Sequence, residues 1–150
     1  MNYQQHLAEI RDEIQPLLGR GRVADYIPPL ARVPLDRFAM VVQTIGDGAF
    51  AIGDTDERFS IQSIAKVFSL TLAMRLDGDA IWKRVGREPS GTAFNSLVQL
   101  EVEHGIPRNP FINAGALVIL DSILSHDGDG TDPILEFVRL AASNPAIGYD

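Results

Sequence analysis

Residues 59–73 read FSIQSIAKVFSLTLA, and this stretch decides the fold. After Ser63 nearly every position is apolar, and Lys66 is the interruption. A helix that is apolar almost all round is typical of the interior of a domain, where an unpaired charge would be costly. The stretch therefore predicts a buried helix that begins near Ser63 and in which the position of Lys66 needs an explanation.

The segments ahead of this helix predict one further helix and a hairpin. Residues 3–18 carry apolar side chains at steps of three and four, which is the period of an amphipathic helix. Residues 37–45 and 49–53 are short runs rich in Val, Ile and Phe. The glycines of Gly46-Asp47-Gly48 between them provide the positive φ of a tight turn. We expect two antiparallel strands here.

The segments that follow predict mainly helices. We expect a short helix at residues 79–85, turns at 86–91, and a strongly apolar helix at 112–124 that begins with small residues. Asp132 and Pro133 are typical of an N-cap and a first helical position, which predicts a helix running to about Ala142. The fold class is therefore α/β, of the α+β kind, with an antiparallel sheet flanked by helices.

Length and composition exclude several classes of protein. The 150 residues correspond to one ordinary domain. A formal net charge of −7 would repel nucleic acid and anionic membrane surfaces. The absence of cysteine excludes disulfides and Cys nucleophiles. No window is apolar enough for a signal peptide or a membrane span. We expect a soluble, cytoplasmic protein with no nucleic-acid or membrane partner.

Ser63 and Lys66 form the one arrangement that suggests covalent catalysis. Residues three apart at the start of a helix share a face, so the Lys66 amine can reach the Ser63 hydroxyl. A serine nucleophile needs a base, and lysine is a base only when uncharged, a form that apolar surroundings favour. The helix N-terminus would also stabilise an oxyanion on a substrate carbonyl. The alternative is an ordinary surface lysine, and spacing alone leaves both interpretations open.

Two further residues are candidates for binding. Asn113 follows a proline-bounded loop, residues 107–110, and its amide could bind a polar ligand or simply cap the next helix. Tyr26 lies in a loop stiffened by Pro28 and Pro29, where it could line a pocket or pack its ring and bond its hydroxyl to the backbone.

No metal site is expected. The histidines, His6, His104 and His126, are far apart and lack the spacing of metal ligands. The aspartates of residues 127–132 superficially match a calcium loop, but the glycine falls at the wrong place and the final glutamate is missing. We interpret this segment as a solvated turn.

Several blocks together resemble one family, the bacterial-type serine-dependent glutaminases, which are related to the serine β-lactamases and penicillin-binding proteins. The resemblance is carried by ADYIPPLA at residues 24–31, FSIQSIAKV at 59–67, EPSGTAFNS at 88–96 and NPFINAGA at 109–116. Ordered blocks are far more specific than one tetrapeptide.

The resemblance implies a role for each matching residue. Ser63 is the expected nucleophile, Lys66 its base, and Asn113 a contact to the bound L-glutamine, while Tyr26 and Asn95 would line the pocket. The implied reaction converts L-glutamine to L-glutamate and ammonia through a γ-glutamyl ester, without metal or organic cofactor. A serine β-lactamase-like fold and a homo-oligomer are also implied.

One departure from the family is that the chain has about half the usual length of the catalytic domain. The Lys-Ser-Gly strand of the family is absent, because the two lysines are followed by Val67 and Arg84. We therefore expect residues 1–150 to be the N-terminal portion of a single truncated domain, inactive by itself. The alternatives are a β-lactamase or peptidase-type serine hydrolase that uses the same pair, and a non-catalytic helical interaction module.

Overall fold

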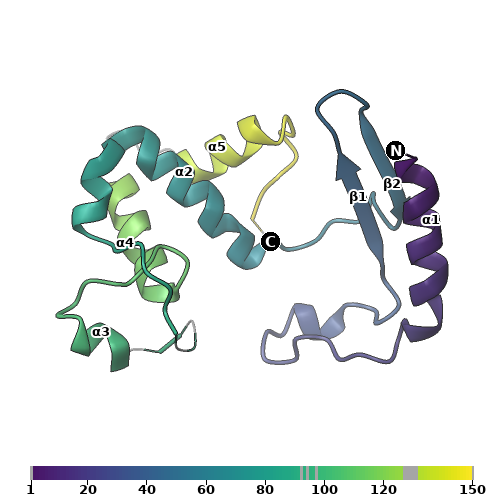
Figure 1. Cartoon of the computed structure of the whole chain (residues 1–150), viewed down its shortest axis with the longest axis horizontal. Helices are drawn as coiled ribbons and strands as arrows, with labels where there is room; N and C mark the ends of the chain where they lie inside the picture. Colours follow the sequence, from purple (N-terminus) through teal and green to yellow (C-terminus); the bar gives the residue numbers. More distant parts are fainter. Residues whose placement is uncertain (1, 92, 94, 97, 127–131, 150) are drawn as a thin grey trace. The chain divides into compact units, whose positions relative to one another are not determined.

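The computed structural model describes residues 2–91, 93, 95–96, 98–126 and 132–149 (Figure 1). The chain forms two compact units, Met1–Phe59 and Ser60–Asp150. The N-terminal unit holds the described sheet, and the C-terminal unit holds the helix that begins near Ser63. The predicted acidic turn falls on residues 127–131, outside the described residues.

The N-terminal unit is a helix packed on a hairpin. Its elements are α1 (Tyr3–Ile14), the 3₁₀ helices η1 (Gln15–Leu17) and η2 (Leu30–Arg32), and the strands β1 (Ala39–Gln43) and β2 (Ala49–Gly53). Asn2 caps α1, since its side-chain oxygen accepts the Gln5 amide. The Tyr3 and Phe50 rings lie 5.3 Å apart where α1 meets β2. The predicted helix and hairpin are confirmed.

The hairpin closes as its turn residues predict. The strands are antiparallel, with Val41 opposite Ala51. Gly48 has φ +87°, a conformation that residues with a Cβ rarely adopt, and its carbonyl accepts the Thr44 amide at 2.9 Å. Exposed and half-buried residues alternate along both strands, which is the pattern of a sheet covered on one face. The α/β class is therefore confirmed, with a two-stranded sheet among the described residues.

The C-terminal unit is helical in the residues that the structure describes. Its elements are η3 (Gln62–Ile64), α2 (Ala65–Asp77), η4 (Gly78–Lys83), α3 (Val98–Val102), α4 (Asn113–Leu124) and α5 (Pro133–Ala141). The predicted helices at 112–124 and 133–142 are confirmed within one residue. Asp132 caps α5 by accepting the amides of Ile134 and Leu135.

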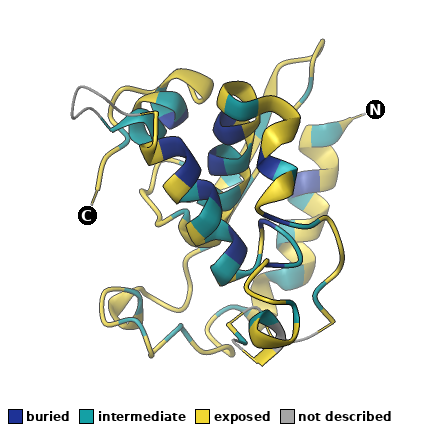
Figure 2. Ribbon diagram, turned by 90° about the vertical axis from the view of Figure 1, so that its left-hand side faces the viewer, coloured by how far each residue is buried: buried dark blue, intermediate teal, exposed yellow. Residues whose placement is uncertain are grey.

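The core of this unit lies where α2 packs against α4, α5 and η4 (Figure 2). Its buried members are Leu72, Ala73, Ile81, Val85, Ile119 and Ile123. Ile119 and Ile123 are one turn apart on α4 and are exposed by 1% and 0%. This spacing makes one face of α4 a continuous apolar surface for α2.

One prediction about these helices needs correction. The helix that begins near Ser63 is not buried all round, because α4 and α5 cover one side and leave Val67 and Met74 exposed by 53% and 45%. The short helix predicted at 79–85 is present as the 3₁₀ helix η4, which covers Gly78–Lys83 and follows directly after α2. The short helix α3 was not predicted, because five residues give no readable period.

Candidate active site

Ser63 lies in η3, which continues directly into α2. Lys66 follows three residues later in α2, and this spacing is expected to place the two side chains on the same side of a helix. The side chain of Ser63 is exposed and that of Lys66 is half-buried. Gln62, the residue before Ser63, has φ +40°, which is a strained conformation for a non-glycine residue. The hydroxyl therefore stands at an accessible, conformationally constrained helix start.

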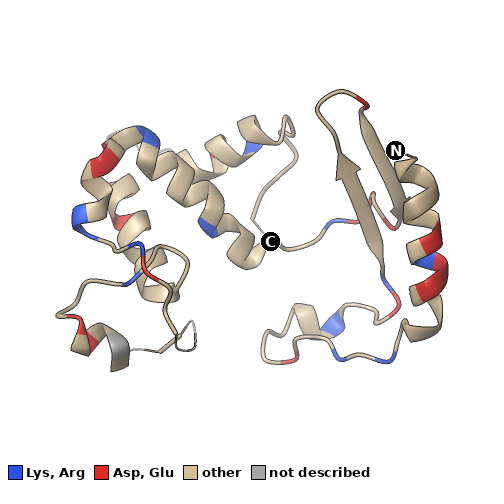
Figure 3. Ribbon diagram, in the orientation of Figure 1, with Lys and Arg blue, Asp and Glu red and all other residues tan. Residues whose placement is uncertain are grey.

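Lys66 is anchored by polar acceptors rather than by apolar neighbours. Its Nζ donates to the Phe111 carbonyl oxygen at 2.9 Å and to Asn113 Oδ1 at 2.8 Å. The apolar setting expected from the sequence is wrong on one side, since Ile64 and Val67 are exposed by 55% and 53%. The first two turns of α2 carry no charge besides Lys66, as the lone blue band near the start of α2 in Figure 3 shows. The two acceptors explain how this isolated charge is accommodated.

Asn113 does not cap α4, and its side chain contacts Lys66 instead. It is the first residue of α4, whose N-cap is Ile112, a residue without a side-chain acceptor. Its Oδ1 accepts a hydrogen bond from the Lys66 ammonium group. The structure thus brings Lys66 and Asn113 together across 47 positions of sequence, and Ser63 lies three residues before Lys66, in η3.

Asn109 stabilises the turn just before α4 with its side chain. Its Oδ1 accepts the amides of Phe111 at 2.9 Å and Ile112 at 3.1 Å. The signal for this role is an Asn directly before Pro110, a combination that favours a side-chain-stabilised turn.

Tyr26 belongs to the N-terminal unit, where its side chain is 78% exposed. Asp25 beside it pairs with Arg22 at 2.7 Å. Asn95 lies in a turn of the C-terminal unit and is exposed. The roles of Tyr26 and Asn95 in a substrate pocket stay predictions.

A second group of serine, aspartate and histidine lies at the other end of α2. The Ser122 hydroxyl donates to one oxygen of Asp77, and His126 Nε2 lies 2.7 Å from the other. These partners, Ser122 first and His126 next, hold the pKa of Asp77 below its ordinary value. In a catalytic triad the histidine contacts the serine, whereas here the carboxylate separates them and Ser122 is 5% exposed. The group ties α2 to α4.

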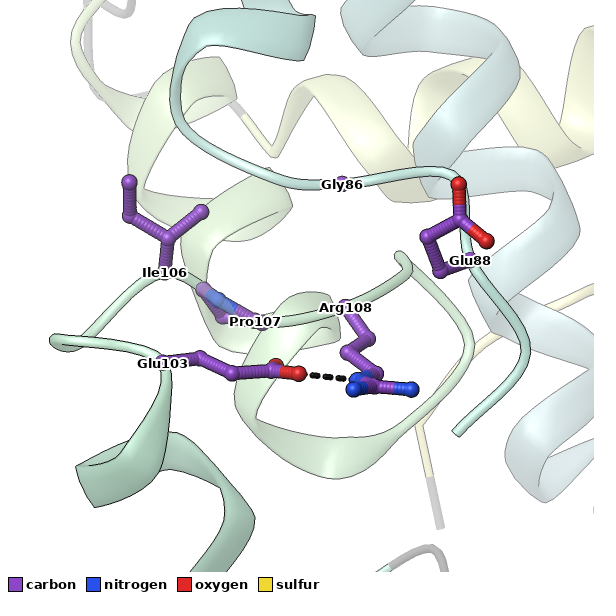
Figure 4. Close-up of a pocket in the computed structure, with 6 residues that line it drawn as sticks. All are labelled: Gly86, Glu88, Glu103, Ile106, Pro107 and Arg108. Carbon is purple, nitrogen blue, oxygen red and sulfur yellow. Dashed lines mark hydrogen bonds and ion pairs between the residues drawn. The ribbon is translucent and has the colours of Figure 1, made fainter. Parts of the chain in front are cut away.

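An open pocket of about 470 Å³ lies on another part of the C-terminal unit (Figure 4). It is lined by Gly86, Glu88, Glu103, Ile106, Pro107 and Arg108. The Arg108 guanidinium points to the Glu103 carboxylate and pairs with it. Since the predicted catalytic residues do not line this pocket, we do not assign the chemistry to it.

Metal and membrane features give no alternative site. Among the described ranges, no group of three or more His, Cys, Asp and Glu side chains is placed to hold a metal ion. His6 pairs with Glu9, and His126 with Asp77. In the part of the chain that the structure covers, every helix is too short or too polar to cross a bilayer.

The fold is that of solved proteins described as glutaminases. The structure of the probable glutaminase ybaS aligns with a TM-score of 0.81 and 34% identity, over 91% of this chain and 44% of that one. Mglu in its L-glutamate binding form aligns with a TM-score of 0.79 and 32% identity, over 96% of this chain and 33% of that one. The fold therefore places the chain in the class of glutaminase-like folds.

Comparison of sequences identifies the family to which the chain belongs. A profile of the Glutaminase family matches residues 21–150. A glutaminase of Paraburkholderia phytofirmans is 56% identical over 150 residues, which is all of this chain and 49% of the relative. The chain belongs to the glutaminase family, and it spans about half the length of the curated relatives it matches. The predicted family is confirmed, and the comparisons do not favour a β-lactamase, a peptidase or an interaction module.

Proposed function

We propose that the complete protein hydrolyses L-glutamine to L-glutamate and ammonia, with Ser63 as nucleophile and Lys66 as its base. The observation that carries this proposal is that Phe111 and Asn113 anchor the amine of Lys66, the residue three positions after Ser63. The family membership supports glutamine as substrate, and Mglu, a structural neighbour, is known in an L-glutamate binding form.

In the proposed first step the Ser63 oxygen attacks the carboxamide carbon of glutamine, and its proton passes to the uncharged Lys66 amine. An uncharged amine has two N–H groups and one lone pair. Phe111 and Asn113 supply two acceptors, so they can orient the N–H groups while the lone pair takes the proton. The negative charge moves to the carbonyl oxygen, which the positive end of α2 stabilises.

The tetrahedral intermediate then collapses. The C–N bond breaks, the Lys66 ammonium returns its proton to the leaving nitrogen, and ammonia departs. The product of this step is a γ-glutamyl ester of Ser63. Water attacks the ester carbon, with Lys66 accepting its proton and giving it to the Ser63 oxygen, which releases L-glutamate and restores the serine.

The finer assignments belong to the same proposal. Asn113 would contact the bound glutamine, Tyr26 would line the pocket, and the complete domain would have the architecture of serine β-lactamases. A cytoplasmic location, a homo-oligomer, and residues 1–150 as the N-terminal portion of one domain are likewise proposed from the family resemblance. Sedimentation of the complete protein tests the oligomer.

The decisive variants are Ser63→Ala and Lys66→Ala in the complete protein. Each should lower ammonia release from glutamine by at least about 1,000-fold, because the covalent step loses its nucleophile or its base. Ser125→Ala is the matched control, because this hydroxyl bonds a helix carbonyl, that of Asp121, at the far end of α4. Unchanged turnover in Ser63→Ala would refute the proposal.

A further inference from the structure

Asn109 connects two segments that the sequence keeps far apart. Its Nδ2 donates to the Glu88 carbonyl oxygen at 2.9 Å, while its Oδ1 accepts from Phe111 and Ile112. One half-buried amide therefore holds the segment after η4 on one side and the two residues just before α4 on the other. Both of its functional groups are used.

The backbone on each side of Asn109 is fixed as well. The Gly86 amide donates to the Pro107 carbonyl at 2.7 Å, and the Glu88 amide to the Arg108 carbonyl at 2.9 Å. On the other side Gly115 faces Asn109, and a Cβ at Gly115 would stand 1.9 Å from the Asn109 carbonyl oxygen. The loop is thus clamped between a backbone ladder and the start of α4.

The clamped loop leads directly to the two residues whose oxygens accept hydrogen bonds from Lys66. The Phe111 carbonyl is two residues after Asn109, and Asn113 is four residues after it. The Phe111 amide that Asn109 holds belongs to the same residue as the carbonyl that receives Lys66 Nζ. Rotation of this short segment would move both acceptors together.

We propose that Asn109 is a positioning residue that sets the acceptors of Lys66 and, through them, the direction of the Lys66 amine at Ser63. The inference rests on the proposed function for its catalytic consequence. Its structural part, the placement of Lys66, does not depend on which reaction the protein performs.

The test uses Asn109→Ala and Asn109→Asp in the complete protein. Alanine removes all three hydrogen bonds of the amide, whereas aspartate keeps the acceptor for the Phe111 and Ile112 amides. We expect Asn109→Ala to lower kcat for glutamine by about 10- to 100-fold with KM changed less than about threefold, because misplacing a catalytic group affects the chemical step. Asn109→Asp should restore most of kcat.

A second readout follows Lys66 without reference to activity. Acetylation by acetic anhydride, resolved by peptide mass spectrometry, compares Lys66 with the exposed Lys83 as an internal reference. Loss of fixed acceptors should raise Lys66 labelling relative to Lys83 several-fold in Asn109→Ala and leave it near wild type in Asn109→Asp. If the alanine variant does not fold, Asn109→Gln, which displaces the same groups by one methylene, should give the same rise and the same loss of kcat.

Asn144→Ala is the matched control, because Asn144 makes a similar turn, accepting the Ala146 amide at 3.0 Å, in a segment that supplies neither of the two acceptors of Lys66. Wild-type kcat and Lys66 labelling in the Asn109 variants would overturn the inference, as would an equal loss in Asn144→Ala. If wild-type protein released no ammonia while Asn109→Ala still raised Lys66 labelling, the proposed function would fail and the positioning of Lys66 would stand.

Discussion

At the scale of single residues, Gly115 is where the candidate site tolerates least change. It is buried in the first turn of α4, against the carbonyl of Asn109. The sequence predicted this, since small residues at the start of the helix allow a backbone to approach. What it could not predict is which backbone approaches, because the partner loop is placed by tertiary contacts.

Gly115→Ala should destabilise the protein by about 1–3 kcal/mol, because the new Cβ meets backbone that has to move. The same substitution in an unobstructed helix would stabilise by up to about 1 kcal/mol, so the sign is diagnostic. Gly148→Ala is the control, with nothing within 4 Å of its added Cβ. Urea unfolding measures both variants, and a stabilised Gly115→Ala would contradict the close approach.

Asp77 gives a prediction about pH. Its pKa is lowered from 3.8 by the Ser122 hydroxyl first and by His126 next. A carboxyl group whose pKa is lower in the folded state stabilises the fold above its unfolded-state pKa, and this contribution disappears as the pH falls through the folded-state value. The free energy of unfolding should therefore decline as the pH drops below 3.8.

Ser122→Ala should lose much of this contribution. Its deficit in unfolding free energy relative to wild type should be largest at pH about 5 and shrink as acid protonates Asp77 in the wild type. Ser125→Ala, whose hydroxyl bonds a backbone carbonyl, should show a deficit that does not vary with pH. Unfolding curves between pH about 2.5 and 5 make the comparison. A deficit in unfolding free energy for Ser122→Ala that stays constant over this range would contradict a stabilising effect of Ser122 on the Asp77 carboxylate.

The catalytic pair shows how far residue-level prediction extends. The spacing of Ser63 and Lys66 is local, and helix geometry determines that they share a face. The acceptors of Lys66 come from residues 45 and 47 positions later. Local patterns contain no information about such contacts, so an apolar setting was predicted where the structure has polar anchors.

At the scale of elements, α4 is the helix on which both the core and the candidate site depend. Its first residue holds Lys66, and its buried face meets α2. The sequence predicted this helix and α5 well because strong apolar runs and an Asp-Pro cap are local signals. The sequence overestimated the burial of α2. An apolar helix sequence does not reveal on how many sides other elements pack against the helix.

Ile119→Ala should therefore cost about 2–5 kcal/mol of stability, since it leaves a cavity between α4 and α2. Leu117→Ala on the same helix is the matched control, because Leu117 is 66% exposed while Ile119 is 1% exposed. Its effect should stay below about 1 kcal/mol. Thermal unfolding of both variants measures the difference, and equal losses would show that α4 does not pack on the face assigned to it.

At the scale of the whole molecule, the chain corresponds to about half of a glutaminase. It spans 49% of the Paraburkholderia phytofirmans relative. We propose from the family resemblance that the Lys-Ser-Gly strand, which residues 1–150 lack, belongs to the part of the relatives' length that this chain does not span. Positioning a carboxamide against a nucleophile and an oxyanion site requires several fixed donors at once.

We expect the 150-residue chain to release no measurable ammonia from glutamine, and the complete protein to do so. An assay of both preparations at equal molar concentration decides this, with circular dichroism to establish that the short chain is folded. Comparable turnover by the two would show that residues 1–150 already contain every group the reaction needs.

The most direct test of the account is to look for the covalent intermediate. Complete protein is mixed with L-glutamine, quenched in acid within the first turnovers, and digested for peptide mass spectrometry. The account predicts a γ-glutamyl ester on the peptide that contains Ser63, and none in Ser63→Ala. Ammonia release with no ester at Ser63, or with the ester on another residue, would contradict it.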